Sequence, residues 1–143
     1  MTVKQISIFL ENKPGQLAGI CRELAKADIN IATLSLADTA DFGIVRMIVS
    51  DVDGALAALK AQNITAKVVD VLAVNISHEV GSLSTLLNAI ADAGINITYM
   101  YCLSTGDTGA SIAFKTDDIP GTEKALEPLD VQYYTPESLE NVE

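Results

Sequence analysis

The sequence predicts an α+β protein made of two ferredoxin-like units, each with the order β-α-β-β-α-β, an antiparallel sheet and both helices on one face. Two observations support this fold class. A segment near the N-terminus recurs later in the chain, and each copy shows the same succession of strand-like and helix-like hydrophobic patterns. The predicted domains are residues 1–69, residues 70–136 and an acidic, frayed tail at 137–143.

The recurrence joins residues 8–31 to residues 74–97 at a constant offset of 66 positions. Gly15 falls on Gly81, and the run Ile-Asn-Ile at 29–31 falls on the same run at 95–97. The offset continues as far as Asp51, which it places on Asp117. Such a register without a gap indicates an internal duplication.

The first copy begins with a strand over residues 3–10, where apolar and polar residues alternate. A helix follows a turn at Asn-Lys-Pro-Gly, because apolar residues recur at helical spacing along one face in both copies. Second strands are expected at 29–37 and 95–103, hairpin turns at 39–41 and 106–107, and third strands at 43–49 and 109–115.

The second helix of the first copy is predicted over residues 52–62 with Asp51 as its N-cap. Its counterpart starts after Pro120 and is interrupted by Pro128. Strands at 64–69, 71–77 and 130–134 complete the two units. No flexible linker separates the copies.

Composition excludes several classes of function. A net charge of −10 without a cluster of Lys and Arg argues against a nucleic-acid partner. No apolar run reaches the length of a membrane span, and no leader precedes the first strand. The two cysteines have no metal-ligand or redox spacing, which favours a reduced, cytoplasmic protein. The glycines form no phosphate-binding motif, so no cofactor is predicted.

The chain resembles the ACT domain in one specific run of elements: a strand that ends in Asn-x-Pro-Gly-x-Leu, a helix, and Asp-Ile-Asn-Ile at the start of the next strand. In both repeats the resemblance implies a free-standing regulatory protein that binds a small molecule, an amino acid, near the meeting point of ACT-like units. The sequence supplies no paired acid and base, so no catalysis is expected. A homodimer is expected because the apolar residues exceed what two small sheets can bury alone and two-fold dimers are the commonest oligomers. The sequence does not identify the regulated target. The alternative is a dimerisation or protein-interaction module without a ligand.

The expected ligand-binding residues lie in the two strand-to-helix loops and at the start of the second strands. The resemblance points to Asn12 and Asn30, with Asn96 equivalent to Asn30. Glycine before a helix also clears the approach to backbone N–H groups that suit a carboxylate, although it can serve only the turn. The full candidate set is Asn12, Pro14, Gly15, Gln16, Leu17, Asn30, His78, Val80, Gly81, Ser82, Leu83 and Asn96.

The two loops differ, since His78 stands where the first copy has Asn12 and Val80 replaces Pro14. His78 is the only histidine, and it reads either as a ligand contact or as a surface residue. Asn30 and Asn96 could bind a ligand or satisfy a neighbouring backbone group. Arg46, in the third strand, is either a carboxylate clamp or a rim residue, and the 66-residue offset gives it Ile112 as counterpart.

Overall fold

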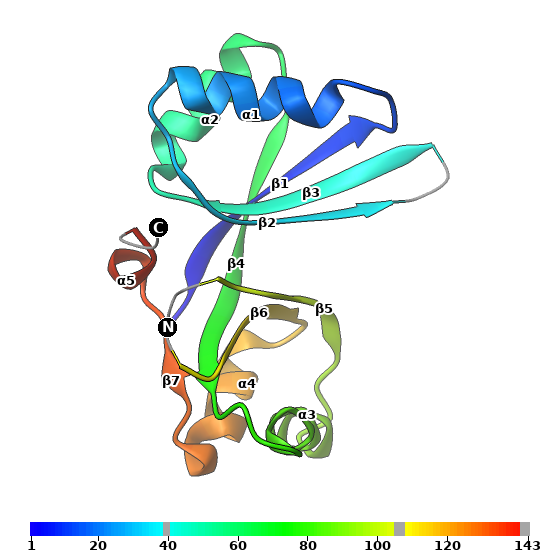
Figure 1. The fold of residues 1–143 in the computed structure, drawn as a ribbon. Helices are drawn as coiled ribbons and strands as arrows, with labels where there is room; N and C mark the ends of the chain where they lie inside the picture. Colours follow the sequence, from blue (N-terminus) through cyan, green and yellow to red (C-terminus); the bar gives the residue numbers. More distant parts are fainter. Residues whose placement is uncertain (39–40, 105–107, 141–143) are drawn as a thin grey trace. The chain divides into compact units, whose positions relative to one another are not determined.

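The computed structural model describes residues 1–38, 41–104 and 108–140, and the chain divides into two compact units. One unit is Lys4–Val69, and the other is Asp70–Glu143 together with Met1–Val3. Each unit has an antiparallel sheet with its two main helices on one face (Figure 1). The predicted α+β class and the ferredoxin-like units are confirmed.

The strand order in the first unit is β2-β3-β1-β4, the order of a ferredoxin-like sheet. Its elements are β1 (Val3–Glu11), α1 (Gln16–Lys26), β2 (Ile31–Asp38), β3 (Phe42–Val49), α2 (Val52–Ala61) and the beginning of β4 (Ala66–Ile76). The register pairs Ile8 with Val45 and Val45 with Leu36. These pairs bring alternate residues of the strands to the face that the helices cover.

The core of the first unit is formed where the strand alternation meets the helical stripe. Ile6, Ile8, Val45 and Met47 are buried from the sheet, and Leu24 is buried from α1. Burying one such side chain contributes about 1.5–3 kcal/mol. The core therefore fixes α1 and the loop before it against the sheet.

The second unit repeats this arrangement with strand order β7-β4-β6-β5. Its elements after β4 are α3 (Ser82–Asp92), β5 (Ile97–Cys102), β6 (Ala110–Thr116), α4 (Ile119–Leu126), the short 3-10 helix η1 (Glu127–Leu129), β7 (Gln132–Tyr133) and α5 (Pro136–Glu140). Leu72, Leu86, Ile90 and Phe114 form its core. Pro128 lies in η1, so the predicted interruption after α4 is present.

One strand replaces two predicted ones. The strands expected at 64–69 and 71–77 form the single strand β4, with four residues in the first unit and the remaining seven in the second. Its central residues 71–74 are all buried, so the sequence there is a continuous apolar run. Such a run lacks the alternation of apolar and polar residues from which the bounds of a strand are predicted.

The offset between the copies changes from 66 to 67 between β5 and β6. Leu36 pairs with Val45 nine positions on, whereas Cys102 pairs with Ile112 ten positions on. One extra residue therefore lies in the second hairpin. The counterpart of Arg46 is Ala113 rather than the predicted Ile112. Residues 39–40 and 106–107 of the predicted hairpin turns lie outside the described residues.

The same shift corrects the pairing of the N-caps. Asp51 caps α2 and Asp118 caps α4, so the structural counterpart of Asp51 is Asp118 rather than Asp117. The sequence match of Asp51 with Asp117 arises only because two aspartates are adjacent in the second copy.

The predicted frayed tail is wrong over residues 137–140, because residues 136–140 form helix α5. The Thr135 N–H donates to Ser138 Oγ at 2.8 Å, and the Ser138 N–H donates to Thr135 Oγ1 at 3.2 Å. This reciprocal cap and the proline at the first helical position favour a helix start, and Leu139 is only 4% exposed. In the described part of the chain, no helix has the length and apolar character needed to cross a membrane.

Candidate functional site

The first strand-to-helix junction is an exposed turn that ends in a left-handed glycine. The Asn12 N–H donates to the Asp41 carbonyl at 3.2 Å, which ties the turn to the end of β3. Gly15 has φ of 86° and occupies the N-cap position of α1. Asn12, Pro14 and Gln16 are exposed, and Leu17 is half-buried. The loop is therefore accessible over its full length.

The second junction repeats this geometry around other side chains. Gly81 has φ of 90° at the N-cap of α3, and Ser82 begins the helix. His78, Val80 and Leu83 are exposed. A Cβ added at Gly15 or Gly81 would meet no heavy atom within 4 Å, so both glycines face open space.

The first helix of each unit lacks the cap that the second helix has. Neither α1 nor α3 has a side-chain cap or an acidic residue in its first turn. In contrast, Asp51 Oδ1 accepts from the Gly54 N–H and Asp118 Oδ1 from the Gly121 N–H, each at 3.0 Å. The Gln16 N–H donates to the Lys13 carbonyl at 3.4 Å and the Ser82 N–H to the Glu79 carbonyl at 3.2 Å. The partial positive charge at the N-termini of α1 and α3, and the remaining first-turn N–H donors, are left for an external anion.

Asn30 and Asn96 lie at the other end of their sheets. The Asn30 N–H donates to Ser50 Oγ at 3.0 Å, and the Asn96 N–H donates to Asp117 Oδ1 at 3.2 Å. Since Asn12 contacts Asp41 and Asn30 contacts Ser50, the eight residues of β3 separate them. At 3.3 Å per residue this is about 25 Å. One unit cannot bring Asn12 and Asn30 to the same small ligand.

Arg46 is half-buried in the middle of β3, where it pairs across the sheet with Ser7 and Ser35. Its strand neighbours Val45 and Met47 belong to the core that the helices cover. Because strand side chains alternate between faces, Arg46 lies on the opposite face of the sheet. The loop glycine and Arg46 therefore do not form one site within this unit.

A groove that sequence reasoning missed lies beside each junction. The first groove has a volume of about 560 Å³ and lies between β1, α1 and the segment after α2. It is lined by Ile8, Phe9, Leu10, Glu11, Gly15, Gln16, Gly19, Ile20, Arg22, Glu23, Gln62, Asn63, Ile64 and Thr65. The second groove, of about 360 Å³, is lined by Asn75, Ile76, Ser77, Ser82, Thr85, Leu86, Leu129, Asp130 and Val131. Both volumes fall in the range of small-molecule sites.

Two lysines of the first unit are paired with glutamates, one in the first loop and one in the last turn of α1. Lys13 Nζ lies 2.6 Å from Glu11 Oε2, and this hydrogen bond raises the pKa of Lys13. Lys26 Nζ lies 3.4 Å from Glu23 Oε1. Across residues 1–38, 41–104 and 108–140, no group of three or more His, Cys, Asp or Glu side chains is placed to hold a metal ion.

The protein thus consists of two ferredoxin-like units. In each unit the first helix has a glycine at its N-cap position and no side-chain cap. The chain belongs to the ACT domain pair family, whose model matches residues 1–142. ACT domains are regulatory modules, and this membership supports a regulatory, ligand-binding role.

Solved structures agree with this assignment. Protein BT0572 from Bacteroides thetaiotaomicron is 34% identical, with a TM-score of 0.91 over 99% of this chain and 98% of that one. The ligand-free regulatory subunit of aspartate kinase from Thermus thermophilus is 18% identical, with a TM-score of 0.57 over 88% and 89%. That of Thermus flavus is 17% identical, with a TM-score of 0.58 over 87% and 90%. The two kinase subunits share the fold, and no curated protein matches the chain significantly.

Proposed function

We propose that this chain is a non-catalytic regulatory protein that binds an amino acid at its strand-to-helix loops. One observation carries the proposal. In both copies a left-handed glycine opens onto an uncapped helix N-terminus, while aspartate caps the companion helix. An α-carboxylate matches the N–H donors and partial positive charge left there. An amide or imidazole from the loop completes the contact with the ammonium or carboxylate group.

The first loop is the better site of the two. Pro14 restricts its backbone, and the Asn12 side chain is exposed beside the glycine. The second loop has lost the proline and presents His78 instead. Pre-organisation lowers the ordering cost of binding, so we expect the first loop to bind with higher affinity.

Thermal-shift measurements against the twenty amino acids test the proposal. A ligand at 100 times its Kd adds about 2.7 kcal/mol to the free energy of unfolding and raises the melting temperature. Isothermal titration calorimetry then gives the affinity and stoichiometry. If no amino acid stabilises the folded chain, the amino-acid assignment is wrong.

Asn12→Ala isolates the contribution of the first loop. Loss of one hydrogen bond to a buried ligand group costs about 1–3 kcal/mol, roughly a 5- to 150-fold loss of affinity. His78→Ala is the matched change in the second loop and is expected to matter less. Asn30→Ala tests the opposite end of the unit, where the Asn30 backbone is hydrogen-bonded to Ser50. Unchanged affinity in folded Asn12→Ala removes the first loop from the site.

We also propose that the chain forms a homodimer. Phe9 and Phe42 are 71% and 51% exposed. Phe9 pairs with Ile44 and Glu11 with Phe42, so the two rings lie on the same sheet face. Exposed aromatic clusters of this kind mark interaction surfaces. A dimeric mass by light scattering combined with no amino-acid response would favour the interaction module without a ligand.

A further inference from the structure

The two grooves are a duplicated feature of the molecule. Each residue that lines the second groove has a counterpart lining the first, at an offset of 66 in β1 and α1 and of 67 after α2. For example, Ile76 matches Leu10, and Asp130 matches Asn63. The matched residues Asn63 and Asp130 share a left-handed backbone, with φ of 60° and 50°. The groove therefore belongs to the repeated unit rather than to one copy.

The grooves begin at the proposed carboxylate site and continue along the first helix. Gly15 and Gln16 line the start of the first groove, and Gly19 lines it one turn later. A Cβ added at Gly19 would meet nothing within 4 Å. The second groove has Thr85 at this place, and its volume is smaller. A ligand anchored at the helix N-terminus thus has room to extend along α1.

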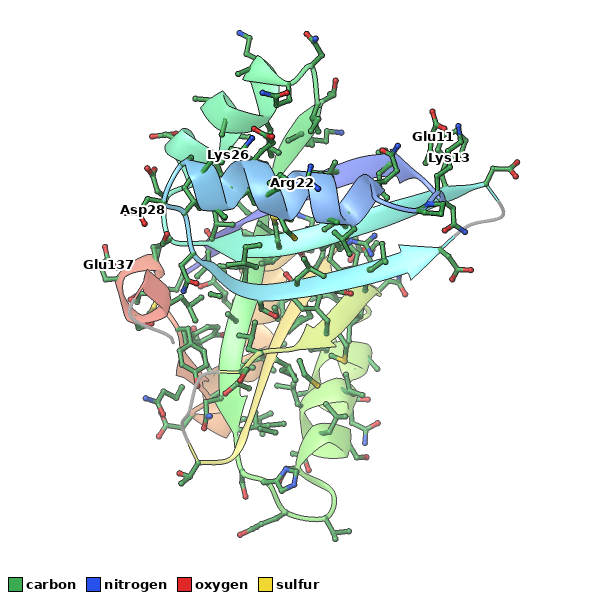
Figure 2. The ribbon with its side chains drawn as sticks, turned by 45° about the horizontal axis from the view of Figure 1, so that its top comes forward. Glu11, Lys13, Arg22, Lys26, Asp28 and Glu137 are labelled. Atoms are coloured by element: carbon green, nitrogen blue, oxygen red, sulfur yellow. The ribbon has the colours of Figure 1, made fainter. Side chains whose placement is uncertain are left out.

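The first groove has one cation that is not neutralised nearby. Glu11 and Glu23 also line it, but each lies beside a lysine. Arg22 is exposed midway along α1 (Figure 2), and among the described residues it has no ion pair. Seven residues separate it from Gly15, about 10 Å along the helix. Helix side chains tilt toward the N-terminus, which shortens the distance to a ligand at Gly15.

The second groove has no cation at the matching place. Among the described residues that line it, Asp130 is the one that carries a charge, and Asn88 occupies the position of Arg22. The exchange of Asn63 for Asp130 keeps the left-handed backbone, because both residue types tolerate it. The copies thus share a backbone and differ, within the described part of the chain, in the charged lining residue that lies outside an ion pair, which is Arg22 in the first groove and Asp130 in the second.

We propose that each groove holds the side chain of a bound amino acid and that the two grooves have opposite selectivity. The first groove binds an amino acid with an anionic side chain, and the second groove binds an amino acid with a cationic side chain. The inference rests on the proposed function, which places the α-carboxylate at the helix N-terminus. Arg22 supplies a guanidinium for a second carboxylate, and Asp130 supplies a carboxylate for a second ammonium.

Calorimetric titration with L-glutamate, L-glutamine and L-lysine tests the first groove. Wild type is expected to bind L-glutamate more tightly than its neutral isostere L-glutamine. Arg22→Asn, which installs the residue of the second copy, should weaken L-glutamate about 10-fold and leave L-glutamine unchanged. Gly19→Thr narrows the groove as Thr85 does and should weaken both. Neither variant is expected to unfold the chain, because Arg22 is exposed and a Cβ at the half-buried Gly19 meets no heavy atom within 4 Å, and circular dichroism checks this.

Asp130→Asn is the matched variant in the second groove. It should weaken L-lysine about 10-fold and leave L-glutamate unchanged, while Arg22→Asn should leave L-lysine unchanged. Equal binding of L-glutamate and L-glutamine to wild type, or no effect of Arg22→Asn, overturns the charge assignment. Binding of other amino acids that still depends on Asn12 would then leave the proposed function standing. Absence of any amino-acid binding defeats both.

Discussion

Two adjacent tyrosines near the end of the second unit differ in how their hydroxyl groups are satisfied. Tyr134 OH lies 2.7 Å from Ser111 Oγ and accepts from Asn75 Nδ2 at 3.2 Å. Tyr133 OH is buried and has no hydrogen-bond partner among the described residues. Burial raises the pKa of Tyr133, and the carboxylates of Glu123 and Glu127 raise it further. One hydroxyl therefore supports the fold, and the other costs desolvation without a bond.

Phenylalanine substitutions at the two tyrosines should have opposite effects. Tyr134→Phe removes the 2.7 Å hydrogen bond that Tyr134 OH shares with the buried Ser111 Oγ and should lower the free energy of unfolding by about 1–3 kcal/mol, while Asn75 keeps its bonds to Thr108 and Ser111. Tyr133→Phe removes an unsatisfied group and should leave stability unchanged or slightly higher. Urea denaturation at pH 7 measures both. A larger loss in Tyr133→Phe than in Tyr134→Phe contradicts this account.

Alkaline pH provides a second test of Tyr133. Its folded pKa is raised above the ordinary value of 10.0, so its contribution to stability is present below that pH. It is lost as the pH rises through the higher folded pKa, because the unfolded chain ionises first. Between pH 9 and 11 the melting temperature of wild type should therefore fall more steeply than that of Tyr133→Phe. Parallel curves would show that the phenol does not titrate differently in the two states.

Glycines four residues apart in and before α1 should respond in opposite directions to alanine. Gly15 has φ of 86°, where a Cβ is disfavoured, so Gly15→Ala should cost about 1–2 kcal/mol. Gly19 is helical with no close neighbour, so Gly19→Ala should add about 0.5–1 kcal/mol. Thermal or urea denaturation without ligand compares them. A stabilising Gly15→Ala would show that the glycine is not needed for the turn.

At the scale of the element, each second helix depends on an aspartate and a glycine that fit together. A Cβ on Gly54 would lie 2.3 Å from Asp51 Oδ2, and one on Gly121 would lie 2.3 Å from Asp118 Oδ2. The carboxylate caps the helix only because the glycine leaves room for it. Both copies therefore start their second helix with the same aspartate–glycine pair.

A double-mutant cycle on this pair should be strongly non-additive. Asp51→Ala removes the cap and should cost about 1 kcal/mol. Gly54→Ala should also destabilise, because its methyl group displaces the carboxylate. In the double variant no clash remains, and alanine favours the helix, so Gly54→Ala should become neutral or stabilising. Additive losses in urea denaturation would contradict this, and Asp118 with Gly121 offers a repeat of the measurement.

The elements could be predicted from the sequence where two copies agree. The helical stripes of α1 and α3 and the turn before them recur at one offset, so each copy checks the other. The prediction failed where that check was absent or misleading. Adjacent aspartates concealed the one-residue insertion before β6, and α5 belongs to no repeat. Its Thr-Pro-x-Ser start was a usable signal.

The grooves could not be predicted in the same way, because each is formed by segments far apart in the sequence. Arg22 reads in the sequence as part of a solvated helix face, and only the fold brings it to a groove that Asn63 also lines. The separation of Asn12 from Asn30 is also a property of the sheet, since it follows from the direction of β3. Ligand binding by the loop residues remains a prediction, whereas the structure defines the backbone geometry of both loops.

At the scale of the whole molecule, the exposed pair Phe9 and Phe42 offers a test of the proposed homodimer. Phe9→Ser should shift the chain toward monomer at micromolar concentration, because it removes a side chain that is 71% exposed. Val80→Ser is the matched control, since Val80 is an exposed apolar residue in the loop before α3. Light scattering over a dilution series compares them. Equal masses for Phe9→Ser and wild type would place the dimer contact elsewhere.

Strand β4 has a consequence for attempts to dissect the chain. Its first four residues belong to one unit and its last seven to the other, so a cut after Val69 divides a continuous strand. A fragment that ends there keeps only a stub of its fourth strand, and the complementary fragment begins inside its first. Separately expressed halves would each need their own copy of residues 66–76. Melting of either half in the intact chain should therefore be felt by the other, as one cooperative transition.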